Sequence, residues 1–202
     1  ALINALELAD KKIDEVKMVV NGAGAAAIAC TKLYIALGLK KENVLMCDSK
    51  GVINHKRENL TPEKLDFIAQ TDISTLEQAL EGADVFVGLS KGDVMAAKML
   101  SSMAENPVVF ALANPTPEID YNLAIATRPD VIMATGRSDF PNQINNVLAF
   151  PGIFRGVLDV RARDVNDEMK MAAAYALAEL VSDDELKPEY ILPEAFDMRI
   201  KD

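Results

Sequence analysis

The sequence has 202 residues, 50% of them hydrophobic and 26% charged, which is typical of a folded globular protein and argues against disorder. Asp and Glu number 31 against 21 Lys and Arg, and the net charge of −10 argues against binding to nucleic acid and against docking on a membrane surface. The two cysteines, Cys30 and Cys47, are too few for a disulfide scaffold or a zinc cluster, and we expect both to be buried free thiols.

The first fifteen residues show a helical pattern. Apolar side chains recur at helical spacing over residues 2–13, and no capping residue precedes them. We therefore assign residues 1–15 to a lead-in helix from an absent upstream domain, residues 16–181 to one domain, and residues 182–202 to a C-terminal tail packed over that domain or a neighbour. Neither a basic secretory signal nor a membrane span of about 20 apolar residues is expected, so the predicted location is cytoplasmic.

Short β-rich runs alternate with helical patterns along the chain. The β-rich runs cover residues 16–20, 43–47, 84–88, 107–112 and 131–134. The helical patterns cover residues 25–37, 62–70, 75–80, 94–104 and 121–126. This alternation predicts an α/β fold of the Rossmann type, a doubly wound parallel sheet with helices on both faces in a single domain. We expect five main strands in the order 2-1-3-4-5.

Three local details accompany this prediction. Residues 49–81 contain no convincing strand pattern. Ser74 and Glu77 match a capping box, which predicts that Ser74 caps a helix. A long helical region extends from about residue 145 to residue 181, and Pro151 with Gly152 should break or bend it.

The strongest local signal for a ligand is a glycine-rich turn directly after the first predicted strand. Residues 22–27 read GAGAAA, which matches the pattern G-x-G-x-x-A, and they open a helix. The first glycine permits the tight turn, the second lets the backbone approach a pyrophosphate, and the small third residue lets the helix pack on the strand. The N–H groups and positive dipole end of the helix then attract phosphates. The alternative is a close-packed strand–turn–helix that holds no ligand.

Asp48 ends the second predicted strand, near the expected position of the acid that binds the adenosine ribose of a dinucleotide. A carboxylate there favours the free 2′-hydroxyl of NAD and repels the 2′-phosphate of NADP. Ser49, Lys50, Lys56 and Arg57 follow closely, and these groups would hold a 2′-phosphate if the loop folds back. The alternative for this basic cluster is a solvated loop.

Asparagines follow two of the later predicted strands, and ligands of open parallel sheets bind at the carboxyl ends of strands. Asn114 is placed to hydrogen-bond a nicotinamide ribose or a substrate, although an Asn-Pro turn also occurs without a ligand. Asn145 and Asn146 precede the next helix, where amide side chains also serve as caps. The single histidine, His55, lies in the loop after the second strand, and we do not expect it to be a catalytic base.

Five stretches together resemble a known family. Residues 19–26, 48–51, 110–119, 135–146 and 150–156 read VVNGAGAA, DSKG, FALANPTPEI, TGRSDFPNQINN and FPGIFRG. On these stretches the chain resembles the NAD(P)-binding, C-terminal domain of malic enzyme, in particular the short bacterial type. The resemblance spans nearly the whole chain. Ala27 departs from it where many relatives carry glycine, a change that the pattern tolerates.

The resemblance implies the site residues. The implied cofactor-binding residues are Gly22, Ala23, Gly24, Ala25, Asp48, Ser49, Asn114 and Asn145. The turn at 22–25 would hold the pyrophosphate, Asp48 the adenosine ribose, and Asn114 and Asn145 the nicotinamide side. Asn146 would hydrogen-bond malate. No catalytic residue or metal ligand is expected in this sequence, because the family's catalytic lysine, tyrosine and acidic metal ligands lie upstream.

The resemblance also implies an activity, oxidative decarboxylation of malate to pyruvate and CO₂ with reduction of NAD, or of NADP. It implies Mg or Mn in the full-length enzyme, an upstream catalytic domain, a homo-oligomer, and no turnover by this chain alone. One alternative is the NAD-binding domain of another two-domain dehydrogenase, of the glutamate- or shikimate-dehydrogenase kind, against which the asparagine-rich loop argues. The other is a nucleotide-sensing domain without catalysis.

Overall fold

The computed structural model describes residues 1–201 and contains a six-stranded sheet in the order β3-β2-β1-β4-β5-β6. The strands are β1 (Met18–Asn21), β2 (Val44–Asp48), β3 (Gly51–Val52), β4 (Val85–Gly88), β5 (Val108–Ala111) and β6 (Ile132–Thr135). All neighbours pair in parallel except β2 and β3, which are antiparallel. The predicted order of the five main strands is confirmed. The prediction of no strand within residues 49–81 is wrong, because β3 turns back on β2 over only two residues, too short to show a pattern.

Each of the parallel strands β1, β4, β5 and β6 is buried along its whole length, as a sheet covered on both faces requires. Successive side chains point to opposite faces, so Met18 and Val20 enter one hydrophobic cluster while Val19 enters the other. Val20 pairs in register with Met46 on one side and with Val87 on the other. The sheet is therefore the middle layer of three, and its carboxyl edge is free to carry loops.

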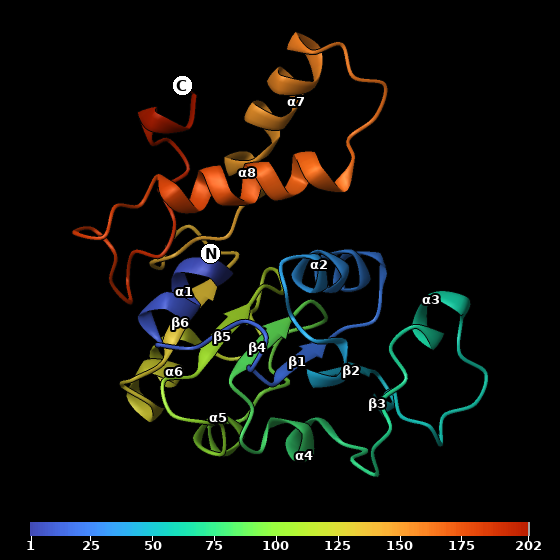
Figure 1. Ribbon diagram of the computed structural model, residues 1–202. Helices are drawn as coiled ribbons and strands as arrows, with labels where there is room; N and C mark the ends of the chain where they lie inside the picture. Colours follow the sequence, from blue (N-terminus) through green and yellow to red (C-terminus); the bar gives the residue numbers. More distant parts are fainter. Residues whose placement is uncertain (202) are drawn as a thin grey trace.

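Helices cover both faces of the sheet (Figure 1), which confirms the predicted fold class. The helices are α1 (Leu2–Leu8), α2 (Ala25–Ala36), α3 (Pro62–Leu65), α4 (Leu76–Leu80), α5 (Ala97–Ser101), α6 (Tyr121–Thr127), α7 (Phe150–Asp159) and α8 (Asp167–Glu179), with 3₁₀ turns η1 (Lys41–Asn43), η2 (Asn146–Leu148) and η3 (Met198–Lys201). Helices α1 and α2 pack on the face that carries Val20, and α4, α5 and α6 pack on the opposite face.

Three local predictions need correction. The opening helix ends at Leu8 rather than near residue 15. The capping box is formed by Thr75 and Gln78, one residue later than predicted, because the Thr75 side chain accepts from the Gln78 amide and the Gln78 side chain accepts from the Thr75 amide. The long helical region breaks after Asp159 and not at Pro151, which lies in the first turn of α7, where proline is tolerated.

The C-terminal tail packs over the rest of the chain. Ile191 is fully buried, and both of its backbone groups are held by asparagine side chains. Its N–H donates to Asn142 Oδ1 at 2.9 Å, and its carbonyl accepts from Asn4 Nδ2 at 3.0 Å. The division into residues 1–15, 16–181 and 182–202 stays a prediction.

Two further predictions concern the burial of the cysteine thiols and the presence of a membrane-spanning helix. Cys47 is buried, and burial raises the pKa of its thiol to about 12, whereas Cys30 is only half-buried, so the prediction of two buried thiols holds for one. Both are free. Within residues 1–201 there is no helix long and apolar enough to cross a membrane.

Candidate functional site

A cavity of about 760 Å³ lies at the carboxyl ends of β1, β2 and β4. Five predicted site residues line it, namely Gly22, Ala23, Gly24, Asp48 and Ser49. Ala25, the first residue of α2, directly follows them. The fold thus brings the glycine turn and the end of the second strand to one hollow, as the order of the strands predicts.

The two glycines of the turn serve different purposes. Gly22 has a φ of +134°, and a Cβ built on it would come within 2.5 Å of the carbonyl oxygen of Leu89, so only glycine fits. Gly24 has an ordinary extended conformation, and a Cβ built on it would meet nothing within 4 Å. The space beside Gly24 is therefore open, which is what the approach of a ligand to the backbone requires.

Gly24 is also the N-cap of α2, and no side chain caps this helix end among residues 1–201. The first N–H groups of a helix lack partners inside the helix, and the aligned peptide dipoles place a partial positive charge there. Ala27 is buried and lets α2 pack closely on β1. An uncapped twelve-residue helix facing an open cavity fits the pyrophosphate of a dinucleotide.

Asp48 is held by two cations and a backbone amide. Arg57 Nη2 and Lys64 Nζ each lie 2.9 Å from Oδ2, and the Lys50 N–H donates to Oδ1 at 2.9 Å. Burial raises the pKa of Asp48, but these hydrogen bonds outweigh it and hold the pKa well below its usual range. The carboxylate is thus ionised, and its charge is more than balanced by its neighbours.

The basic loop after β2 folds back only in part. Arg57 turns onto Asp48, whereas Lys56 pairs with Asp72 at 2.6 Å, away from it. Lys64, in the short helix α3, lines the cavity and was missed from the sequence. No motif could have found it, because only the path of the loop brings α3 back to the end of β2.

The loop after β4 forms the far side of the cavity, and Glu118, from the loop after β5, lies behind it. Asn21 Nδ2 donates to Ser90 Oγ at 2.7 Å, and Ser90 lines the cavity. Glu118 is fully buried behind Ser90 and accepts its N–H at 3.2 Å. Sequence reasoning missed Glu118, because a charged residue inside an apolar stretch gives no signal of where it is buried.

The three predicted asparagines lie at the ends of β5 and β6, outside the lining of this cavity. Asn114 is exposed, and its amide lies against Gly136, where a Cβ would come within 2.7 Å of Nδ2. Asn145 caps η2 by accepting the Val147 N–H at 3.1 Å, so the capping alternative holds for its geometry. Asn146 is exposed. The sheet places these residues on its carboxyl edge without joining them to the glycine turn.

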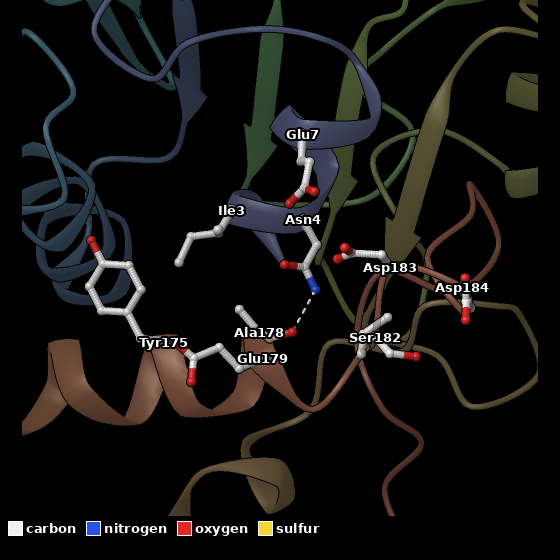
Figure 2. A pocket seen from close by; sticks show the side chains of 10 residues that line it. Ile3, Asn4, Glu7, Tyr175, Ala178, Glu179, Ser182, Asp183 and Asp184 are labelled. Carbon is white, nitrogen blue, oxygen red and sulfur yellow. Dashed lines mark hydrogen bonds between the residues drawn. The ribbon is translucent and has the colours of Figure 1, made fainter.

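A second cavity, of about 590 Å³, lies between α1, α8 and the tail (Figure 2). Carboxylates of Glu7, Glu179 and Asp183 surround it, and Asn4 donates to Ala178 O at 3.0 Å at its edge. It contains none of the predicted site residues. No group of three or more His, Cys, Asp or Glu side chains in residues 1–201 is arranged to hold a metal ion.

Nearly the whole chain is similar to one known family and to several known proteins. The family described as "Malic enzyme, NAD binding domain" matches residues 1–200. The chain is 55% identical over 196 residues to the NADP-dependent malic enzyme of Halomonas elongata, covering 97% of this chain and 46% of that protein. It is 47% identical over 204 residues to the NAD-dependent malic enzyme of Geobacillus stearothermophilus, covering 98% of this chain and 42% of that protein.

A solved structure agrees with these matches. The crystal structure of the NAD-dependent malic enzyme of Thermotoga maritima superposes with a TM-score of 0.90 at 44% identity, covering 99% of this chain and 53% of that chain. This chain spans about half the length of these relatives. The chain belongs to the family of malic enzyme NAD-binding domains.

Proposed function

We propose that the chain binds NAD or NADP as the cofactor-binding part of an enzyme that oxidises and decarboxylates malate to pyruvate and CO₂. The observation that carries this proposal is the open space beside Gly24, at the uncapped start of α2, inside a cavity that also reaches Asp48. Family membership leaves no support for the alternative of a glutamate- or shikimate-dehydrogenase-like protein.

The chain's own residues bind the cofactor and orient it and the substrate. The backbone from Gly22 to Ala25 holds the pyrophosphate through amide N–H groups, and Asp48 with Ser49 binds the adenosine ribose. Asn114 and Asn145 contact the nicotinamide side. A bound nicotinamide supplies the acceptor for the hydride that leaves C2 of malate.

Asn146 hydrogen-bonds malate, and its exposure supports this role. In the neighbouring Asn145, Oδ1 accepts the Val147 N–H as a cap, so its Nδ2 is the group that would contact the nicotinamide side. The resemblance to malic enzyme implies that residues outside this chain carry out the proton transfers and bind the Mg or Mn ion.

The pocket favours NAD and also accommodates NADP. Asp48 offers its carboxylate to a ribose hydroxyl, but Arg57 and Lys64 neutralise its charge and reduce its repulsion of a 2′-phosphate. Relatives of both kinds exist at similar identity, since NADP-dependent and NAD-dependent malic enzymes of Rhizobium meliloti are 48% and 46% identical to the chain.

The whole enzyme is expected to contain an upstream catalytic domain and to form a homo-oligomer in the cytoplasm. Side chains of α7 support a protein contact, because Phe150, Phe154 and Leu158 are more than half exposed. The net charge of −10 continues to argue against a nucleic-acid partner.

The test is calorimetric titration of the 202-residue chain with NADH and NADPH, followed by an assay for malate-dependent reduction of NAD and NADP. We expect binding without turnover. Absence of binding of both cofactors would contradict the proposed site, and turnover by this chain would contradict the assignment of the proton transfers to residues outside it.

A further inference from the structure

Glu118 is a fully buried carboxylate at the carboxyl ends of β4 and β5. Each of its oxygens accepts a backbone N–H from a different loop: Oε1 from Ser90 at 3.2 Å and Oε2 from Ala113 at 3.0 Å. One side chain thus ties together the loop that follows β4 and the loop that follows β5. No polar atom of this buried side chain is left without a partner among residues 1–201.

The backbone around Glu118 is shaped to admit this side chain. A Cβ built on Gly88, the last residue of β4, would come within 2.5 Å of Oε1, so the carboxylate occupies the space that a larger residue would fill. The loops also pair directly, because the Met95 N–H donates to the Glu118 carbonyl at 2.9 Å and the Asp93 N–H donates to the Pro117 carbonyl at 3.0 Å. The carboxylate is therefore one part of a wider contact between the two loops.

The two backbone amides that donate to Glu118 lie next to predicted parts of the cofactor site. Ser90 lines the cofactor cavity, and its hydroxyl accepts from Asn21, the residue before the glycine turn. Ala113 immediately precedes Asn114. Glu118 thus connects the glycine turn, through Ser90, to the asparagine expected at the nicotinamide side.

Burying a carboxylate in the protein core is energetically unfavourable. Burial raises the pKa of Glu118, and the amide hydrogen bonds from Ala113 and Ser90 oppose that rise. Burying a charge without a cation is unfavourable unless hydrogen bonds compensate. An apolar side chain would avoid this cost but would leave two loop amides without acceptors.

We propose that Glu118 is a positioning residue, which fixes the loops at Ser90 and Asn114 so that they meet the nicotinamide end of the cofactor. This role rests on the proposed binding of NAD or NADP. Glu118 touches neither substrate nor cofactor in this account. It acts through the backbone amides that it holds, and its loss is expected to affect the nicotinamide half of the dinucleotide and to spare the adenosine half.

The test uses Glu118→Gln in the 202-residue chain, with Glu105→Gln as a control that makes the same chemical change at an exposed position. A glutamine has one acceptor oxygen, so its NH₂ group faces one of the two loop amides. We expect amide hydrogen exchange at Ser90 or Ala113 to accelerate about tenfold, while exchange in β4 and β5 stays unchanged. We also expect NADH to bind about tenfold more weakly, and ADP to bind within about twofold of the wild type.

The outcomes separate this role from the proposed function. Equal weakening of NADH and ADP, or no change in exchange and NADH affinity, would overturn the positioning role while leaving cofactor binding intact. A wild-type chain that binds neither nucleotide would overturn the proposed function and this role with it. If Glu118→Gln does not fold, Glu118→Asp is measured in the same way, because it keeps the charge but is too short to reach both amides.

Discussion

Replacing Gly24 with valine is expected to abolish cofactor binding and leave the fold intact. A Cβ at this position meets no atom within 4 Å, and the φ of −89° with ψ of −178° lies in the region that β-branched residues prefer. The added isopropyl group would occupy the open space at the start of α2, where we place the pyrophosphate.

The expected loss of stability is small, and the expected loss of cofactor affinity is large. Valine is a poorer N-cap than glycine, which costs about 0.5–1 kcal/mol of stability and lowers Tm by about 1–4 °C. Each hydrogen bond between a backbone amide and a charged phosphate contributes about 1.5–3 kcal/mol. Loss of two such bonds weakens binding by at least about 100-fold.

The assay is calorimetric titration of each variant with NADH, beside a thermal melt. Gly156→Val is the matched control, because a Cβ there also meets nothing within 4 Å but lies in α7, away from the cavity; its affinity should equal that of the wild type. Gly22→Ala is the contrasting variant and should lose stability, because its φ is +134° and the Leu89 carbonyl blocks the added carbon. A folded Gly24→Val chain with unchanged affinity would refute the reasoning.

Three further predictions follow from the site. In the full-length enzyme, Asn146→Ala should lower kcat/KM for malate by about 10- to 150-fold with little change in cofactor affinity. Asn145→Ala should instead cost about 1 kcal/mol of stability, because it removes a cap. A thermal melt measured beside malate kinetics distinguishes the two variants, and normal malate kinetics for Asn146→Ala would contradict its substrate role. Lys64→Met should weaken NADPH binding by about tenfold and NADH binding by less than about twofold, and equal loss for both would place the 2′-phosphate elsewhere. Because the pKa of Asp48 is lowered in the folded chain, its contribution to stability is present above about pH 4 and is lost as pH falls below that value. Urea unfolding between pH 3 and pH 7 should therefore show that the free energy of unfolding falls less steeply toward acid pH in Asp48→Asn than in the wild type. Parallel decreases in the two proteins would contradict this prediction.

Much of the fold could be predicted, because its signals are local. Buried parallel strands appear as continuous apolar runs, and the alternation with helices leaves few topologies. The two-residue strand β3 has no such signal. The start of α8 did have one, since Asn166 accepts the Met169 N–H as an N-cap and precedes two acidic residues, but the helical composition around it hid the break.

The candidate site was predictable in its backbone part and not in its charged part. The turn at residues 22–25 is encoded by adjacent residues, so the pattern could indicate it directly. Lys64 reaches Asp48 only because the chain after β2 folds back, and Glu118 reaches two loops only because β4 and β5 are neighbours. Contacts of this kind depend on tertiary structure, which spacing in the sequence does not reveal.

The most direct test of the central claim is a map of the amides whose NMR signals shift when NADH is added to the 202-residue chain. We expect the largest shifts at residues 22–27, at residues 48–51 and at Ser90, around the cavity at the carboxyl ends of β1, β2 and β4. Shifts confined to the cavity between α1, α8 and the tail, or no shifts at saturating NADH, would contradict the claim that this edge of the sheet binds the cofactor.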